Sequence, residues 1–286
     1  MRNRNSIGIW AARILLTLLA VIILLPMVQT FLYSFSSTGE MTALMDTRDN
    51  RNLNEWMDPH LSPNLFSLGQ YEQVLIKDDK ILFYFTNSVK YAAAILLGQT
   101  LVIPALAFGL SKFKFRGREA IFFLIVMLML LPFQVTMVPN VLTLRFMGLM
   151  DTVWAVILPM IFAPFFIFLL RQYMIALPDE LLEAASMDGA GPFRSFLWIV
   201  LPVCRPVLGA AAALSFAESW NLVEQPLTYL SKSETLMPLS TRFNQMMAGS
   251  QGYEFAGAAL YILPALLIYL FFQEDILAGI QLTEMK

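Results

Sequence analysis

Cysteine and histidine are almost absent from this chain of 286 residues, which holds one of each, Cys204 and His60. One cysteine excludes an internal disulfide, and one histidine cannot by itself build a metal site. The sequence also lacks a G-x-x-x-x-G-K-[ST] segment, the loop that cradles nucleotide phosphates. We therefore expect no catalytic residue, no metal and no cofactor in this chain. If the protein performs work, the energy for that work has to come from a partner or from an ion gradient.

Charged residues are scarce as well, at 14% of the chain, whereas apolar residues make up 58%. That balance excludes an ordinary soluble domain. Six apolar runs approach the length of about 20 residues with which a helix crosses the hydrocarbon. They are Ile14–Phe35, Tyr91–Leu110, Ala120–Pro139, Thr152–Leu170, Val203–Val223 and Phe255–Phe272. The sequence therefore predicts an all-α polytopic membrane protein with six transmembrane helices.

Prolines inside these runs are expected to kink or break the helices, where neighbouring helices or water re-satisfy the freed backbone groups. They are Pro26, Pro104, Pro132, Pro159, Pro164 and Pro264. The first run has the basic flank of a secretory signal peptide, but its 22 residues exceed a typical apolar signal region and no A-x-A-like site follows. We interpret it as a retained first span.

Basic residues are distributed unevenly along this topology. With the N-terminus inside, an even number of spans returns the C-terminus inside, and eleven Lys and Arg residues lie inside against seven outside. This bias predicts that both termini are cytoplasmic. We expect residues 1–35 to form the cytoplasmic N-terminus and first span, residues 36–80 a polar external loop, and residues 81–286 a five-helix core. A cytoplasmic loop at about residues 178–202 interrupts that core.

The loop at residues 178–202 has the sequence of a helix-turn-helix. Pro178 can occupy a first helical position, and Asp179 and Glu180 place negative charge at the helix N-terminus. Gly189 is expected to end this helix, and Pro192 can begin a second one. The sequence therefore predicts two short helices held at the membrane face.

Residues 183–190 of this loop read E-A-A-S-M-D-G-A, and residues 199–202 read I-V-L-P. The pattern resembles the EAA loop of the membrane subunits of bacterial ABC importers, whose coupling helix docks into a cleft on a separate ATPase subunit. An ordinary amphipathic interfacial loop is the alternative. The resemblance implies that the contact with the ATPase is made by Glu183, Ala184, Ala185, Asp188, Gly189 and Ala190. Within this set, Glu183 would supply polar contacts, the alanines a close approach, Gly189 the turn and Asp188 a cap.

Further segments resemble the sugar-importing branch, and are similar to the second permease of maltose-type transporters. The resemblance covers roughly residues 62–281 and includes Asn87-Ser88, residues 113–118, residues 132–140 and Ser219-Trp220-Asn221. Residues 277–286 depart from the usual Gly-Ala-Val-Lys-Gly ending. That departure favours a subgroup that imports longer or acidic oligosaccharides.

The resemblance implies a set of partners in the bacterial cytoplasmic membrane. These are a second homologous permease, two ATPase subunits that hold ATP and Mg²⁺, and an extracytoplasmic sugar-binding protein, with no nucleic acid. Sugar recognition combines aromatic stacking with hydrogen bonds, so the pathway candidates are Gln134, Asn140, Trp220 and Asn221. Interhelical packing is the alternative role of each of these side chains, and the partner permease is the alternative location of the site.

Three classes of function are compatible with these patterns. The first is a permease subunit of an ABC sugar importer, the second an ABC permease for another solute, and the third a gradient-driven carrier. The loop around Glu183 favours the first two classes over the third. The segments around Phe113 and Trp220 favour sugar as the solute.

Overall fold

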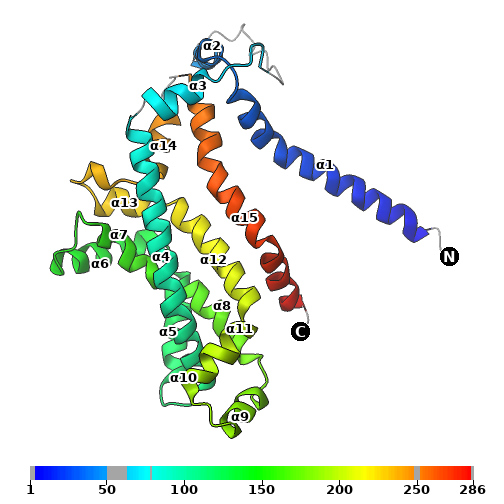
Figure 1. Ribbon diagram of the computed structural model, residues 1–286, viewed down its shortest axis with the longest axis vertical. Helices are drawn as coiled ribbons and strands as arrows, with labels where there is room; N and C mark the ends of the chain where they lie inside the picture. Colours follow the sequence, from blue (N-terminus) through cyan, green and yellow to red (C-terminus); the bar gives the residue numbers. More distant parts are fainter. Residues whose placement is uncertain (1–3, 50–62, 78, 248–251, 285–286) are drawn as a thin grey trace. The chain divides into compact units, whose positions relative to one another are not determined.

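The computed structural model describes residues 4–49, 63–77, 79–247 and 252–284. Within these ranges the regular structure is helical, apart from one isolated β-bridge between Ser36 and Phe66 (Figure 1). Four of the described helices are long and apolar enough to cross a membrane, or up to six when each of two bent pairs counts as one crossing. The all-α polytopic fold predicted from the sequence is confirmed. His60 and the middle of the expected external loop, residues 50–62, lie outside the described ranges.

The chain divides into two compact units, Met1–Leu82 with Phe243–Leu263, and Phe83–Arg242 with Pro264–Lys286. In the first unit, α1 (Arg4–Tyr33) contains the expected first span and is followed by α2 (Thr38–Asp49), α3 (Gly69–Glu72) and η1 (Gln73–Lys77). The buried Gln70 amide joins these segments, because its Nε2 donates to the carbonyls of Tyr33 at 2.7 Å and Ser36 at 3.0 Å. The division predicted from the sequence assigns residues 1–35, 36–80 and 81–286 to particular sides of a membrane. That assignment stays a prediction.

The second unit holds most of the predicted spans. Its helices are α4 (Asp79–Lys112, from Phe83 on), α5 (Arg118–Leu130), α6 (Phe133–Phe146), α7 (Val153–Ile161), α8 (Pro164–Ile175), α9 (Glu180–Met187), α10 (Pro192–Ser195), η2 (Phe196–Val200), α11 (Leu201–Val203), α12 (Arg205–Trp220), α13 (Glu224–Tyr229) and η3 (Glu234–Leu236). Two further helices have residues in both units, and they are α14 (Leu239–Met247) and α15 (Glu254–Glu284). Figure 1 shows α9 at one end of the second unit and α13 towards the other.

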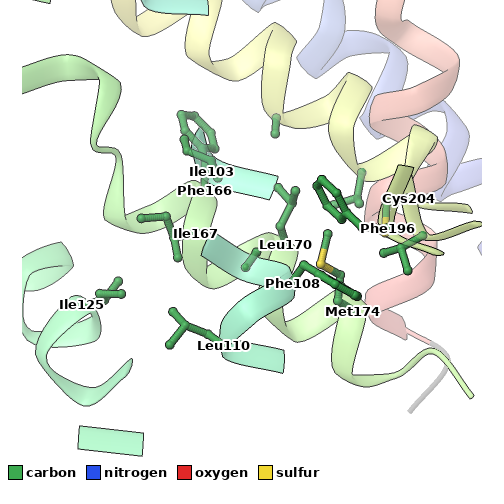
Figure 2. Packing of buried hydrophobic residues seen from close by; sticks show 14 residues of the cluster. Ile103, Phe108, Leu110, Ile125, Phe166, Ile167, Leu170, Met174, Phe196 and Cys204 are labelled. Carbon is green, nitrogen blue, oxygen red and sulfur yellow. The ribbon is translucent and has the colours of Figure 1, made fainter. Parts of the chain in front are cut away.

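The apolar core of the second unit gathers where α4 and α8 pack together. Figure 2 shows labelled members of this cluster, which α4 and α8 contribute together with α5 and the segment after α10. Its buried side chains include Ile103, Phe108, Leu110, Ile125, Phe166, Ile167, Leu170, Met174, Phe196 and Cys204. The core therefore lies next to the predicted helix-turn-helix and supports it.

Two predicted spans meet a sharp bend, and the first bend lies at Pro132, where the sequence predicts a kink or break. Residues 120–139 form α5 and α6, which meet at an angle of 110°, and α12 meets the helical turns Pro192–Val203 at 76°. Pro132 causes the first bend, because a proline pushes the residue before it into extended backbone, and Leu131 has φ −79° and ψ 125°. Pro206 lies in the first turn of α12, where it cannot donate to the preceding turn.

The other expected proline breaks have two outcomes. Pro164 begins α8 after two extended residues, so the run from Val153 to Ile175 is interrupted as predicted. Pro26, Pro104, Pro159 and Pro264 instead lie inside continuous helices. A proline in a helix removes one hydrogen bond, and packing against neighbouring helices can compensate for that loss.

Candidate functional site

The polar loop forms a helical hairpin in which α9 is followed by continuous helical turns from Pro192 to Val203. The main-chain N–H groups of Leu182 and Glu183 donate to the carbonyl of Asp179, at 2.9 and 3.0 Å. Asp179 is thus the N-terminal capping position, and Glu180 is the first residue of α9. The helix begins two residues after Pro178, the predicted first position.

Gly189 ends α9, as the sequence predicts. Its φ of 79° lies in the left-handed region that favours glycine. The N–H of Ala190 donates to the carbonyl of Ala185 at 2.9 Å, and the N–H of Gly189 donates to that of Ser186 at 3.0 Å. These two bonds form a Schellman motif, which satisfies the last carbonyls of the helix and fixes the direction of the following chain.

The residues of the motif lie on different faces of α9. Glu183, Ala184, Asp188 and Gly189 are exposed, and Ala190 is half-buried. Ala185, in contrast, is 6% exposed, so its methyl group lies inside the hairpin. Ala184 therefore offers an accessible small surface, whereas Ala185 packs against the chain itself.

Met187 is a further side chain of the exposed face, and the sequence pattern did not single it out. It is 89% exposed although it is apolar. Methionine adapts its shape to irregular apolar pockets, so it is suited to a docking surface. Its position inside the E-A-A-S-M-D-G-A segment was the only signal in the sequence, because a helical pattern alone does not say which face is covered.

Lys112, the last residue of α4, ties the hairpin to the membrane-spanning helix. Its Nζ donates to the carbonyl of Leu177 and to Oδ1 of Asp179, both at 2.7 Å. The lysine side chain is 7% exposed and the Asp179 side chain 73%. This hydrogen bond and the lysine charge hold the pKa of the Asp179 carboxyl below its usual value. The ion pair is therefore present at neutral pH and is lost only as the pH falls through that lowered pKa.

Arg171 of α8 joins three helices beside the hairpin. Its Nε donates to the carbonyl of Leu110 at 3.0 Å, and its Nη2 donates to both carboxylate oxygens of Glu119 at 3.0 and 3.1 Å. Its guanidinium carbon lies 3.6 Å from the centre of the Phe122 ring. Arginine thereby satisfies a carbonyl that α4 leaves without a partner at its C-terminus.

The four pathway candidates differ in exposure and in surroundings. Trp220 is 1% exposed, with its ring stacked on Phe216 and edge-on to Phe85. Its stacking face is therefore covered in this conformation, and the predicted contact with sugar stays untested. Asn221 is exposed, and its Nδ2 donates to the carbonyl of Ala217 at 2.9 Å.

Gln134 and Asn140 both lie on α6, but their surroundings differ. Gln134 is exposed, and its Nε2 lies 3.2 Å from each carboxylate oxygen of Glu224. Asn140 is half-buried. The structure thus pairs Gln134 with the exposed carboxylate of Glu224, three residues beyond Asn221.

The described residues hold no group of three or more His, Cys, Asp or Glu side chains that could bind a metal ion. Cys204 is buried in the core beside Val200 and Val207. The chemistry of the described site is therefore that of polar and small side chains on a capped hairpin, anchored by Lys112.

The bent and straight apolar helices, with a capped polar hairpin anchored to one of them, define a multi-pass helical membrane protein. The chain belongs to the family of binding-protein-dependent transport system inner membrane components, whose profile matches residues 81–274. It is therefore a transport component and a membrane permease.

Named relatives support the same assignment. The chain is 30% identical over 237 residues to the arabinooligosaccharides transport system permease protein AraQ of Bacillus subtilis, covering 79% of this chain and 81% of that protein. It is 30% identical over 274 residues to the diacetylchitobiose uptake system permease protein NgcG of Streptomyces coelicolor, covering 93% and 85%.

A solved structure shares the fold. A chain in the crystal structure of a bacterial ABC transporter involved in the import of the acidic polysaccharide alginate superposes with a TM-score of 0.79. The match covers 96% of this chain and 98% of that chain, at 23% sequence identity. The chain as a whole therefore has the fold of an ABC importer permease.

Proposed function

We propose that this chain is one of two permease subunits in a binding-protein-dependent ABC importer for sugars or oligosaccharides. The observation that carries the proposal is the capped hairpin, whose exposed face includes Glu183, Ala184 and Asp188 and whose base is bonded to Lys112. A short capped helix with small exposed side chains is suited to a cleft on another subunit, because small side chains let two backbones approach closely. We expect the subunit that provides this cleft to be a separate ATPase.

The mechanism that follows is mechanical coupling. ATP binding closes the ATPase dimer, α9 moves with it, and the membrane helices change from inward-facing to outward-facing. Lys112 and the Schellman motif at Gly189 resist bending of the hairpin, so displacement of α9 reaches α4. This chain makes and breaks no covalent bond in that cycle. The ATP and Mg²⁺ that the cycle uses are bound by the ATPase subunits.

Sugar is the solute that the named relatives favour, since AraQ and NgcG are named for oligosaccharide uptake. A second candidate is a small phosphorylated polyol, because the sn-glycerol-3-phosphate transport system permease protein UgpE of Pectobacterium atrosepticum is 32% identical over 199 residues. That match covers 68% of this chain and 70% of the relative. Uptake of labelled oligosaccharide and of labelled glycerol phosphate by the reconstituted complex separates the two.

Orientation can be tested by cysteine labelling. A cysteine at Ser186 is expected to react with an impermeant maleimide only from the cytoplasmic side, and one at Asn52 only from outside, as the eleven-to-seven basic bias predicts. Ser186 is exposed on α9, and the native Cys204 is buried, so the parent protein serves as the unlabelled control. Reversed labelling would contradict the cytoplasmic hairpin and its contact with an ATPase.

The energy source gives a further prediction. Because the sequence has no phosphate-binding loop, the purified chain alone is expected neither to hydrolyse ATP nor to take up sugar under an imposed ion gradient. Both activities are measured in liposomes, with the complete complex as the positive control. Gradient-driven uptake by the chain alone would make it a secondary carrier.

A further inference from the structure

The Asn87-Ser88 pair, which resembles a family segment without an assigned role, lies near the beginning of α4 and binds a distant stretch of backbone. Asn87 Nδ2 donates to the carbonyls of Thr235 at 2.9 Å and Met237 at 3.1 Å. Ser88 Oγ accepts from the N–H of Leu239 at 2.8 Å. The stretch that they bind, residues 235–239, is called here the 235–239 segment.

Tyr91 completes this attachment one helical turn further along α4. Its hydroxyl donates to the carbonyl of Leu236 at 2.8 Å. Asn87, Ser88 and Tyr91 are 7%, 1% and 2% exposed, so the α4 side of each bond is shielded from water. Such bonds are costly to break, because the buried side-chain groups on α4 would stay without a partner. The 235–239 segment is therefore held to α4 at four main-chain groups.

The opposite end of α4 is attached to the hairpin. Lys112 binds the Leu177 carbonyl and the Asp179 carboxylate, and Arg171 binds the Leu110 carbonyl. Asn87 and Lys112 are about 37 Å apart along the helix at 1.5 Å per residue. One helix is thus bonded at its two ends to two segments that lie far apart in space.

The middle of α4 is also fixed, at the break between α7 and α8. Pro164 has no N–H to donate to the Met160 carbonyl, and Gln99 Nε2 donates to it instead at 2.7 Å. Ser215 Oγ of α12 donates in turn to Gln99 Oε1. Gly98 allows this approach, because a Cβ there would lie 2.5 Å from Cδ1 of Ile161.

Apolar packing supports α4 on both sides of Pro104, the one residue that weakens its own hydrogen bonding. Before Pro104, Tyr91 and Ile95 are buried in one cluster with residues of α7, together with Leu222 and Leu230. After it, Phe108 is buried in the core with residues of α8. Close-packed interiors transmit displacement rather than absorb it.

We infer that Asn87, Ser88 and Tyr91 are positioning residues that make the 235–239 segment move together with the coupling hairpin, through α4. The inference rests on the proposed function, because the hairpin moves only if an ATPase docks on it. Under this arrangement, closure of the ATPase dimer changes the exposure of a segment at the far end of the membrane helix. Removal of the bonds at Asn87 and Tyr91 leaves only the Ser88 bond and weakens the coupling of the two ends without touching the docking surface.

The test uses the assembled importer with a cysteine at Thr235, whose side chain is exposed and whose main-chain bond is unaffected by the substitution. Labelling by an impermeant maleimide is timed in the nucleotide-free complex and in the complex trapped with ATP and vanadate. The parent protein, which lacks the new cysteine, is the control for background labelling, since its Cys204 is buried. The labelling rates are expected to differ between the two states.

The variants are Asn87→Ala, the gentler Tyr91→Phe, and both together. In the double variant the ratio of labelling rates is expected to fall towards one, since three of the four bonds are lost and only the Ser88 bond still holds the segment to α4. Basal ATP hydrolysis is expected to stay at the parent level. Thr100→Val is the matched control on the same helix, because the Thr100 hydroxyl bonds only the Leu96 carbonyl of α4 itself, and it is expected to keep the parent ratio.

Each result has one meaning. A parent ratio that the double variant retains overturns the positioning role and leaves the proposed function intact. A parent protein that retains no ATPase subunit and labels equally in both states contradicts the proposed function itself. If Asn87→Ala does not assemble, Tyr91→Phe decides, because it keeps the ring and removes only the hydroxyl.

Discussion

Replacement of Ala184 by arginine is expected to abolish transport while the chain still folds and inserts. Ala184 is exposed on α9, so the long cationic side chain meets no neighbour within the chain but holds the docking partner away. Close packing at the centre of an interface tolerates little added volume. The measurements are uptake by the reconstituted complex and co-purification of the ATPase with the tagged permease, both of which should be lost.

The control variants separate docking from folding. Ala184→Ser keeps the small volume and is expected to retain transport. Ala185→Arg forces a charge into the hairpin, where the methyl group is 6% exposed, so it should lower the amount of folded protein as well. If the Ala184→Arg variant keeps full uptake and co-purifies with the parent amount of ATPase, the exposed face of α9 is excluded as the docking surface.

Replacement of Trp220 by alanine is expected to prevent assembly rather than to weaken sugar binding alone. The indole is 1% exposed. Its ring centroid lies 5.5 Å from the ring centroid of Phe216 and 5.6 Å from that of Phe85. Truncation of a buried tryptophan leaves a cavity and costs about 3–5 kcal/mol. The measurements are the yield of folded complex and its Tm, both of which should fall, whereas Trp220→Phe should lose less.

Asn221 and Gln134 provide the comparison, because both are exposed and neither fills the core. Asn221→Ala and Gln134→Ala are expected to leave the Tm unchanged. Loss of a neutral hydrogen bond to the solute would weaken uptake by about 0.5–1.5 kcal/mol, or about two- to tenfold. A normal Tm with reduced uptake in Trp220→Ala would instead return the indole to the pathway. Unchanged uptake in Asn221→Ala and Gln134→Ala would assign recognition to the partner permease.

The sequence by itself determined the features that depend on neighbouring residues. Long apolar runs identified the membrane helices, because a span must bury about 20 residues whatever its packing. Gly189 marked the end of α9, since few other residues adopt a positive φ, and its φ is 79°. Pro132 and Pro164 marked two interruptions, because a proline cannot donate to the preceding turn. The order of residues in the loop was sufficient to indicate the family.

Tertiary structure alone decided the features that depend on residues far apart in the chain. The sequence placed Ala184 and Ala185 together, and only packing separated an exposed from a buried methyl group. A bend of 110° between α5 and α6 follows from the surroundings of Pro132, because a proline permits a break without fixing its angle.

The same holds for the polar anchors. Lys112 and Asp179 are bonded although 67 positions separate them, and Asn87 and Met237 although 150 do. Which carbonyl a buried side chain satisfies depends on which helix lies beside it, and no local pattern carries that information. The sequence therefore located the hairpin, and only the packed helices showed what it is attached to.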